Sequence, residues 1–173
     1  MERTKSTIRV VCDAGPIIHL DELGCLDLLD DFQEISLSDT VWKEISRYRP
    51  SALRRIDLPF VRLSGVIPSN EALLTMCTIF SLDAGEIEAL ALMEQRPEAM
   101  FLTDDAAARL VAKQMGFNVH GTIGILVRSI RRGQMKPKEV LRILTEIPQK
   151  TTLYIKHSLL EEILLKIRNE FNL

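Results

Sequence analysis

The chain has 173 residues, of which 46% are hydrophobic and 27% are charged, so it is long enough to bury a sizeable core without disulfide or metal staples. Its formal net charge of −2 excludes a global basic field, so any contact with nucleic acid would depend on local basic patches. Three cysteines without a C-x-x-C pair exclude a disulfide scaffold and a zinc finger, no apolar run is long enough to span a membrane, and we expect a cytoplasmic protein.

Short apolar runs alternate with helical patterns in the first part of the chain. Residues 7–12 form a β-branched run that ends in Asp13 and is followed by a helical pattern. Residues 35–37 predict a second strand, and residues 40–48 predict a helix on which Glu44 flanks the apolar face. Two carboxylates therefore stand next to the first two strands of a predicted sheet.

A basic stretch separates this helix from the next strand. Residues 47–62 carry five arginines and two prolines and predict a loop before a strand at residues 61–63. Because arginine clusters bind phosphates, Arg49, Arg54 and Arg55 are candidate nucleic-acid-binding residues, although a solvated loop is the alternative.

The pattern of strand, carboxylate and helix returns in the second half of the chain. Asp83 and Glu86 begin a helix with the D-x-x-E spacing of a reciprocal helix cap. Residues 100–102 are an apolar run that leads through a threonine to Asp104 and Asp105, and another helix follows. One of the two aspartates is needed to cap that helix, which leaves the other for a site, and Asp105 is the candidate with Asp104 beside it.

The last part of the chain predicts helices around one more strand. Pro148 breaks a helical pattern, residues 151–155 predict an edge strand, and Ser158 predicts a capping box for the last helix. The apolar stripe of that helix needs a surface to pack on. We therefore divide the chain into an α/β domain over residues 7–135 and a C-terminal helical extension over residues 136–173, which packs on the domain or on a dimer partner.

Strands that alternate with helices predict a three-layer α/β/α sandwich with a central parallel sheet. Successive strand ends then share one edge, so Asp13 lies near Asp104 or Asp105. Glu44 and Glu86, at or near the starts of helices that leave this edge, reach the same pocket. Crowded carboxylates need a cation to stay ionised, and a set without His or Cys selects Mg²⁺ or Mn²⁺. Such a site activates water for attack on a phosphodiester.

The same residues carry a family resemblance. The segments VVCDAGPIIHL, VWKEI, LDAGEIEAL and LTDDAAARLVAKQMGFNVHGTIGIL resemble the ordered acidic motifs of a PIN domain over about residues 9–133. The last two are especially similar to a prokaryotic branch related to VapC-type toxins. The resemblance implies a metal-dependent ribonuclease whose acids are Asp13, Glu44, Glu86 and Asp105, with Asp104 as substitute or helper. The implied metal ligands are Asp13, Glu86, Asp105 and Asp104. Glu86 departs from the pattern, because many toxins of the superfamily have Asp there.

The resemblance further implies RNA as the substrate, an inhibitory antitoxin protein as a partner, and a homodimer. The alternative is a catalytically silent PIN-like module that binds RNA or a partner protein. A phosphatase of the haloacid-dehalogenase kind is disfavoured, because it needs a second Asp two residues after the nucleophilic one, and Asp13 is followed by Ala14 and Gly15.

Overall fold

The computed structural model describes residues 4–173. In chain order its strands are β1 (Arg9–Cys12), β2 (Glu34–Ser38), β3 (Phe60–Leu63), β4 (Met100–Leu102) and β5 (Asn118–His120). Its helices are α1 (Ala14–Glu22), the 3₁₀ helix η1 (Leu26–Asp31), α2 (Asp39–Tyr48), α3 (Pro50–Leu53), α4 (Glu71–Ile79), α5 (Ala84–Gln95), α6 (Ala106–Gln114), α7 (Thr122–Arg131), α8 (Pro137–Lys150) and α9 (His157–Phe171). No helix in this part of the chain has both the length and the apolar character that crossing a membrane requires.

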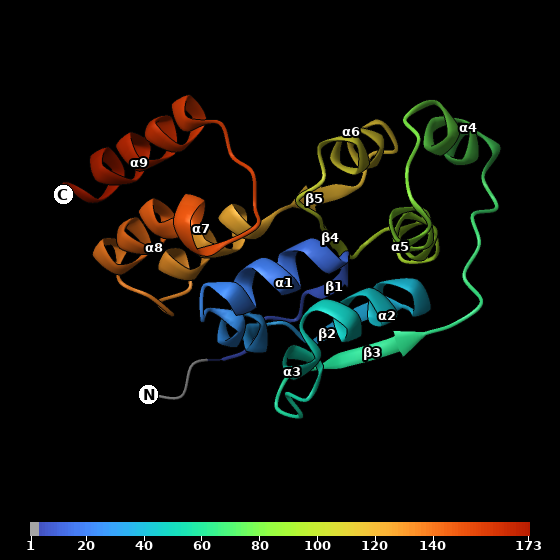
Figure 1. Ribbon diagram of the computed structural model, residues 1–173, viewed down its shortest axis with the longest axis horizontal. Coiled ribbons are helices and arrows are strands. Elements are labelled where there is room, and N and C mark those ends of the chain that lie inside the picture. Colours follow the sequence, from blue (N-terminus) through green and yellow to red (C-terminus); the bar gives the residue numbers. More distant parts are fainter. Residues whose placement is uncertain (1–3) are drawn as a thin grey trace.

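The strands form one parallel sheet in the order β3-β2-β1-β4-β5. The central strand β1 is flanked by β2 and β4, and its apolar residues from Val10 onward are fully buried. A strand covered on both faces has no polar alternation, which is why this run predicted a central parallel strand. The predicted three-layer α/β/α sandwich is confirmed (Figure 1).

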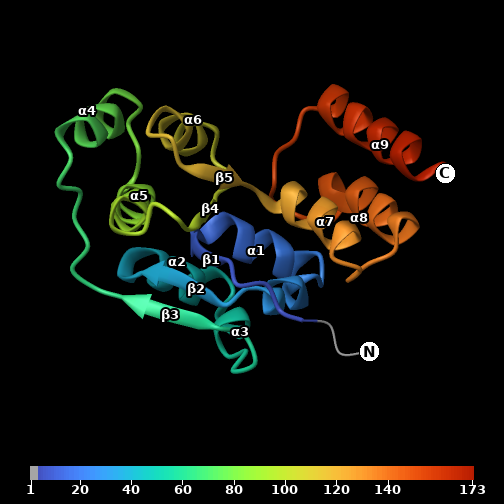
Figure 2. The same ribbon diagram turned by 180° about the vertical axis from the view of Figure 1, so that it is seen from behind.

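Alternate residues of β1 face two separate cores. Val10 and Cys12 pack with buried residues of α1, α2 and α7, whereas Val11 packs with those of α4, α5 and α6. Figures 1 and 2 show these two groups of helices on opposite sides of the sheet. The same alternation continues past the ends of β1 and β4 and determines which carboxylates lie on the same side of the sheet.

The two C-terminal helices share the first of these cores. Their buried side chains belong to the same apolar cluster as those of α1 and α7; they are Val140, Ile143, Leu144 and Ile147 of α8 and Leu160, Leu164 and Ile167 of α9. α9 lies beside α8 at the end of the molecule away from α4 (Figure 2). The stripe predicted for the last helix is therefore buried within this chain along these positions.

Three local predictions in this region are wrong. α8 continues through Pro148, which stands in its last turn: the missing N–H costs the helix one hydrogen bond, to the carbonyl of Leu144, and the Thr151 N–H still donates to the carbonyl of Ile147. Residues 151–155 form no strand: Leu153 and Ile155 pack on the core while Tyr154 is exposed, so the alternation reflects packing without a β-ladder. The last helix begins at His157 without a side-chain cap, and the expected box at Ser158 is absent.

Candidate active site

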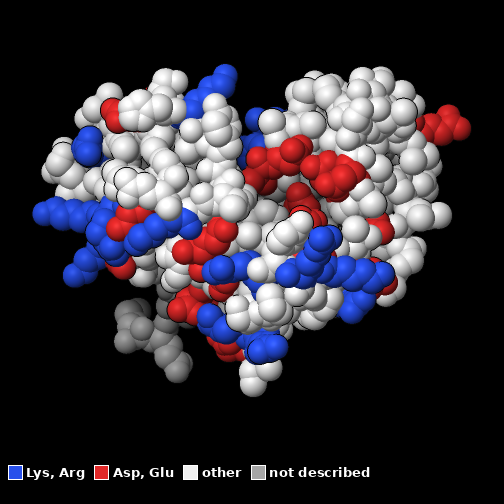
Figure 3. All heavy atoms as spheres, in the orientation of Figure 1, with Lys and Arg blue, Asp and Glu red and all other residues white. Residues whose placement is uncertain are grey.

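Five carboxylates gather at the carboxyl edge of the sheet, where β1 and β4 end and α1, α5 and α6 begin. This acidic cluster consists of Asp13, Glu44, Asp83, Glu86 and Asp105, and negative charges within it raise the pKa values of Asp13, Glu44 and Glu86. Figure 3 shows acidic side chains along a hollow on this face, with Lys and Arg side chains over α2 beneath them. Three of the four acids predicted around Asp13 are thus near it, and Asp83, predicted only as a cap, joins them.

Asp13 lies at the centre of the edge and is only 8% exposed. Its N–H continues the ladder between β1 and β4 by donating to the carbonyl of Leu102 at 2.8 Å. One carboxylate oxygen accepts the N–H of Ala14 at 2.8 Å, which caps α1, and the other accepts the hydroxyl of Thr103 at 3.0 Å. Burial, and to a smaller extent the charges of Asp83 and Glu44, raise the pKa of Asp13 to about 6, and these two hydrogen bonds oppose the rise.

Glu86 occupies the first turn of α5 and forms a capping box with Asp83. The Asp83 N–H donates to Glu86 Oε2 and the Glu86 N–H donates to Asp83 Oδ1, both at 2.9 Å. Burial raises the pKa of Glu86 to about 7, and the hydrogen bond from the Asp83 N–H opposes that rise. The negative charges of Asp83, Asp105 and Asp13 add to it. Glu86 therefore has both a capping role and a place in the acidic cluster.

Glu44 reaches the cluster from α2. A Cβ built on Gly85 would lie 3.4 Å from Asp83 Oδ1 and 3.7 Å from Glu44 Oε2, so this glycine lies between the two carboxylates. Burial raises the pKa of Glu44, and the charge of Asp83 adds to the effect. The sequence placed Glu44 at the rim of the apolar face of its helix, and the structure directs its carboxylate toward the cluster.

Asp105 and Asp104 face different sides of the sheet. Asp105 is exposed, and its Oδ1 caps α6 by accepting the N–H of Ala108 at 2.8 Å. The residues of β4 alternate, with Phe101 in the core beneath α5 and α6 and Leu102 in the core beneath α1 and α7. Thr103 and Asp105 consequently belong with Asp13 and Glu86, and Asp104 is turned to the other side.

Asp104 is held there by three donors from two other elements. The Thr122 N–H donates to Oδ1 at 2.7 Å, the Thr122 hydroxyl donates to Oδ2 at 2.5 Å, and His19 Nδ1 lies 2.7 Å from the same Oδ2. Gly121, the N-cap of α7, has no side chain, so Asp104 supplies the cap from β4. Nothing in the sequence pairs His19 and Thr122 with Asp104, because the contact joins residues far apart in the chain.

Gly121→Ala is expected to destabilise the protein, because its Cβ would lie 2.5 Å from Asp104 Oδ1 and 3.1 Å from the Thr103 carbonyl oxygen. Overpacking of this kind costs about 1–3 kcal/mol. Thermal unfolding of Gly121→Ala beside Gly124→Ala checks this, since the nearest contact at Gly124 is a longer 3.3 Å to the His120 ring. Equal melting temperatures for the two variants would contradict it.

The predicted nucleic-acid-binding arginines lie at the opposite edge of the sheet. α2 leaves the carboxyl edge and returns to the amino edge, so the residues that follow it come out away from the acids (Figure 1). Arg49 Nε donates to Asp21 Oδ2 at 2.6 Å, and Arg55 is paired with Asp27 and Asp57. Arg54 is exposed at the end of α3. The structure therefore does not bring Arg49, Arg54 and Arg55 together with the acidic cluster.

The acidic cluster suits a hard divalent cation by its chemistry, since its donors are carboxylate oxygens. Within residues 4–173 no three His, Cys, Asp or Glu side chains are placed together closely enough to hold a metal ion. Glu86 and Asp105 each direct one oxygen to a backbone N–H of a helix start. The donor types thus fit Mg²⁺ or Mn²⁺, and the residues that offer them, apart from Glu44, also cap the helices around the site.

Comparison with known families gives one match. The family model of the PIN domain covers residues 9–169 of the chain, and it therefore includes α8 and most of α9. No curated protein matches the chain.

Proposed function

Since the chain belongs to the PIN domain family, whose members are generally nucleases, we propose that it is a Mg²⁺- or Mn²⁺-dependent endoribonuclease. In this proposal Asp13, Glu86 and Asp105 hold the ion and Glu44 completes the acidic rim. Asp104 is assigned to positioning, because its carboxylate is hydrogen-bonded to His19 of α1 and Thr122 of α7.

The crowding of carboxylates at one edge carries this proposal. Asp13 and Glu86 have pKa values raised to about 6 and about 7, because both are shielded from water and face other acids. At neutral pH the repulsion between these groups costs the fold stability, although Asp13 and Glu86 also cap helices. A divalent cation offsets their repulsion, and a nuclease needs the same cation for its chemistry.

The chain's own residues would perform distinct tasks in this reaction. When bound, the ion polarises water and neutralises charge on a phosphodiester oxygen. Thr103 fixes the orientation of Asp13, and it also accepts the N–H of Asp105 at 3.2 Å, so one hydroxyl orients two members of the cluster. Glu44, whose pKa is raised, is the acid free to accept a proton from the attacking water.

The finer assignments rest on resemblance. We propose that the protein is the toxin of a toxin–antitoxin pair or a relative of one, with RNA as substrate, an antitoxin as inhibitory partner and a homodimeric assembly. The second candidate is the catalytically silent module, and the observation in its favour is that no three acids converge on a single point among the described residues.

Cleavage of RNA with and without metal tests the proposal. We expect the wild-type protein with Mn²⁺ to cleave a mixed pool of unstructured RNA oligonucleotides, EDTA to stop cleavage, and Glu86→Gln to lower the rate at least 100-fold. Gln at this position still accepts the Asp83 N–H, so the cap and the fold remain. Glu94→Gln, on the same helix and bonded to Ser69, is the matched control. Cleavage that persists in Glu86→Gln would contradict the proposed site.

A further inference from the structure

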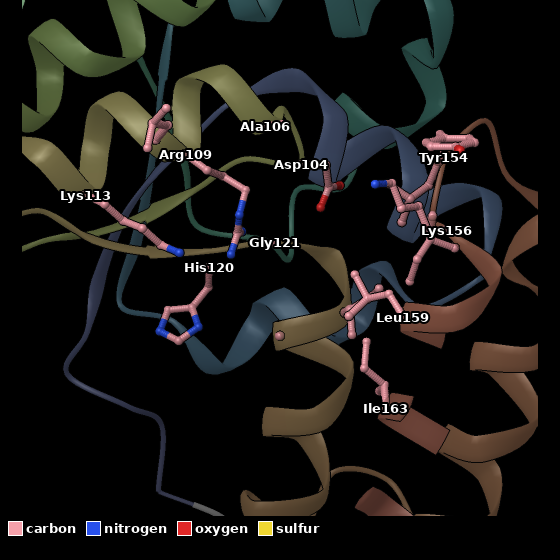
Figure 4. Close-up of a pocket in the computed structure, with 15 residues that line it drawn as sticks. Asp104, Ala106, Arg109, Lys113, His120, Gly121, Tyr154, Lys156, Leu159 and Ile163 are labelled. Atoms are coloured by element: carbon pink, nitrogen blue, oxygen red, sulfur yellow. The ribbon is translucent and has the colours of Figure 1, made fainter. Parts of the chain in front are cut away.

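A groove of about 740 Å³ lies next to Asp104 and is lined by no member of the acidic cluster. One wall is a stripe of α6, made of Ala106, Arg109, Leu110 and Lys113. The other wall is the segment after α8 together with the start of α9, made of Leu153, Tyr154, Ile155, Lys156, Leu159 and Ile163. The floor is the end of β5 and the first turn of α7, and Asp104 lies at the inner end (Figure 4).

The groove carries cations that have no anionic partner. No ion pair joins Arg109, Lys113 or Lys156 to a carboxylate within residues 4–173, whereas several arginines outside the groove, among them Arg49, Arg55 and Arg128, are paired. Figure 4 shows Arg109 and Lys113 reaching in from one wall and Lys156 from the other. Arg109 donates only to the carbonyl of Thr103, at 3.3 Å.

The one carboxylate in the groove does not cancel this charge. Asp104 is 11% exposed and is already bonded to Thr122 and His19. An anionic occupant therefore finds three available cations in a protein whose net charge is −2. The charge of the groove selects an anion.

The position of the groove selects the kind of anion. Asp104 and Ala106, which line the groove, stand on either side of Asp105 in the chain, so the groove reaches the carboxyl edge of the sheet next to the N-cap of α6, although Asp104 itself faces away from the acidic cluster. The cluster itself repels phosphates, and a substrate strand needs cations beside it to remain there. The arginines at the amino edge cannot serve, because they lie across the sheet from the acids.

The size and lining of the groove select an unpaired strand. Its volume is in the range of about 300–1,000 Å³ typical of sites for small ligands, which accommodates a few nucleotides and no duplex. The aliphatic side chains of its walls suit bases and riboses that are not stacked in a helix. Tyr154, 84% exposed at the rim, offers a ring on which one base can stack.

We propose that this groove is the track for single-stranded RNA, with Arg109, Lys113 and Lys156 bound to its phosphates. The inference rests on the proposed nuclease function and adds to it the surface that holds the strand. It also gives the C-terminal segment a role, because one wall of the track is built from residues 153–163.

Binding of a labelled ten-nucleotide oligouridine, followed by fluorescence anisotropy in EDTA so that no cleavage occurs, tests the groove. Lys113→Ala with Lys156→Ala is the first variant, since both side chains are exposed and their loss does not threaten folding. Lys138→Ala with Arg168→Ala removes the same charge from exposed positions outside the groove and is the matched control.

We expect the groove variant to bind at least ten-fold more weakly at low salt and the control to bind like wild type. Adding Arg109→Ala is expected to reduce the slope of log affinity against log salt by about 2 in total, the value for three phosphate contacts to a single strand. A duplex of the same length is expected to be insensitive to the groove variant.

Unchanged oligouridine affinity in the groove variant would overturn the proposal. The aliphatic walls would then suit a segment of protein as the occupant of the groove. An equal loss for the duplex would overturn the assignment to single strands. An equal loss in the control would show that only overall charge matters, which also overturns it. A separate experiment tests the nuclease function: if calorimetry detects no Mn²⁺ binding to the wild-type protein, the nuclease function fails whatever the RNA affinity is.

Discussion

Saturating Mn²⁺ is expected to raise the melting temperature of the wild-type protein at pH 7.5, and Asp13→Asn is expected to abolish this response while melting higher than wild type in EDTA. The metal-free site holds crowded negative charge, and the substitution removes the most buried of these charges. At a Mn²⁺ concentration one hundred-fold above its dissociation constant, ligand linkage gives about 2.7 kcal/mol, or about 5–10 °C for a domain of this size.

The direction of the pH dependence follows from the raised pKa values. The pKa of Asp13 rises from 3.8 to about 6 on folding, so the folded state binds its proton more tightly than the unfolded state does. The stability from this proton is fully present below about pH 4 and is lost as the pH rises through about 6. The stability from the proton on Glu86 is lost in the same way as the pH rises through about 7. For Asp13 the loss is on the order of 3 kcal/mol.

Thermal melts from pH 5 to pH 8 check this prediction. In EDTA the wild-type protein is expected to lose stability across this range, and with Mn²⁺ it is expected to lose less. Asn keeps an acceptor for the Ala14 N–H, so the cap of α1 survives in the variant. Glu98→Gln, an exposed carboxylate before β4 at the far edge, serves as the control. A metal-free Asp13→Asn protein that melts below wild type at pH 7.5 would show that the hydrogen bonds of Asp13 outweigh the repulsion.

Sequence patterns predict those parts of the site that depend on one element and its direction. An apolar run that ends in a carboxylate before a helix places Asp13 at a strand end, because parallel strands deliver their ends to one edge. The same rule places the pair after β4. The position of Glu86 follows from a different pattern. D-x-x-E at a helix start fixes its side chain through the capping box.

The misplaced arginines show where such patterns fail. Arg49 and Arg55 follow the helix of Glu44 closely in sequence, but that helix carries the chain from the carboxyl ends of the strands back to their amino ends. Their partners, Asp21 and Asp27, come from α1 and η1, and no local pattern encodes that pairing. The groove was missed for the same reason, because its two walls come from α6 and from the segment that leads into α9.

The choice between Asp104 and Asp105 depends on alternation along a strand of only three residues. The sequence predicts that one of them caps α6 and that Asp105 is left for the site, whereas in the structure Asp105 itself caps α6. The register of β4 separates them, because Phe101 and Leu102 already face different cores. The two positions therefore differ in function although they are adjacent in sequence.

Substitutions at these two aspartates are accordingly expected to have opposite effects. Asp104→Ala leaves the Thr122 N–H, the Thr122 hydroxyl and His19 without their acceptor, and we expect a loss of about 2–4 kcal/mol in the free energy of unfolding, with Mn²⁺ binding retained. Asp105→Asn keeps the α6 cap, because Asn caps helices as well as Asp, so its stability is expected to lie within about 0.5 kcal/mol of wild type.

Asp105→Asn is expected instead to weaken Mn²⁺ binding at least ten-fold and RNA cleavage at least 100-fold. Chemical denaturation measures the stability of both variants, and calorimetry measures their Mn²⁺ binding. Asp104→Asn, which keeps the shape of the side chain, is the third variant. Loss of Mn²⁺ binding in a folded Asp104→Asn protein, with binding intact in Asp105→Asn, would exchange the assignments. In that case Asp104 would have to release Thr122 to reach the metal, and the start of α7 would move with metal binding.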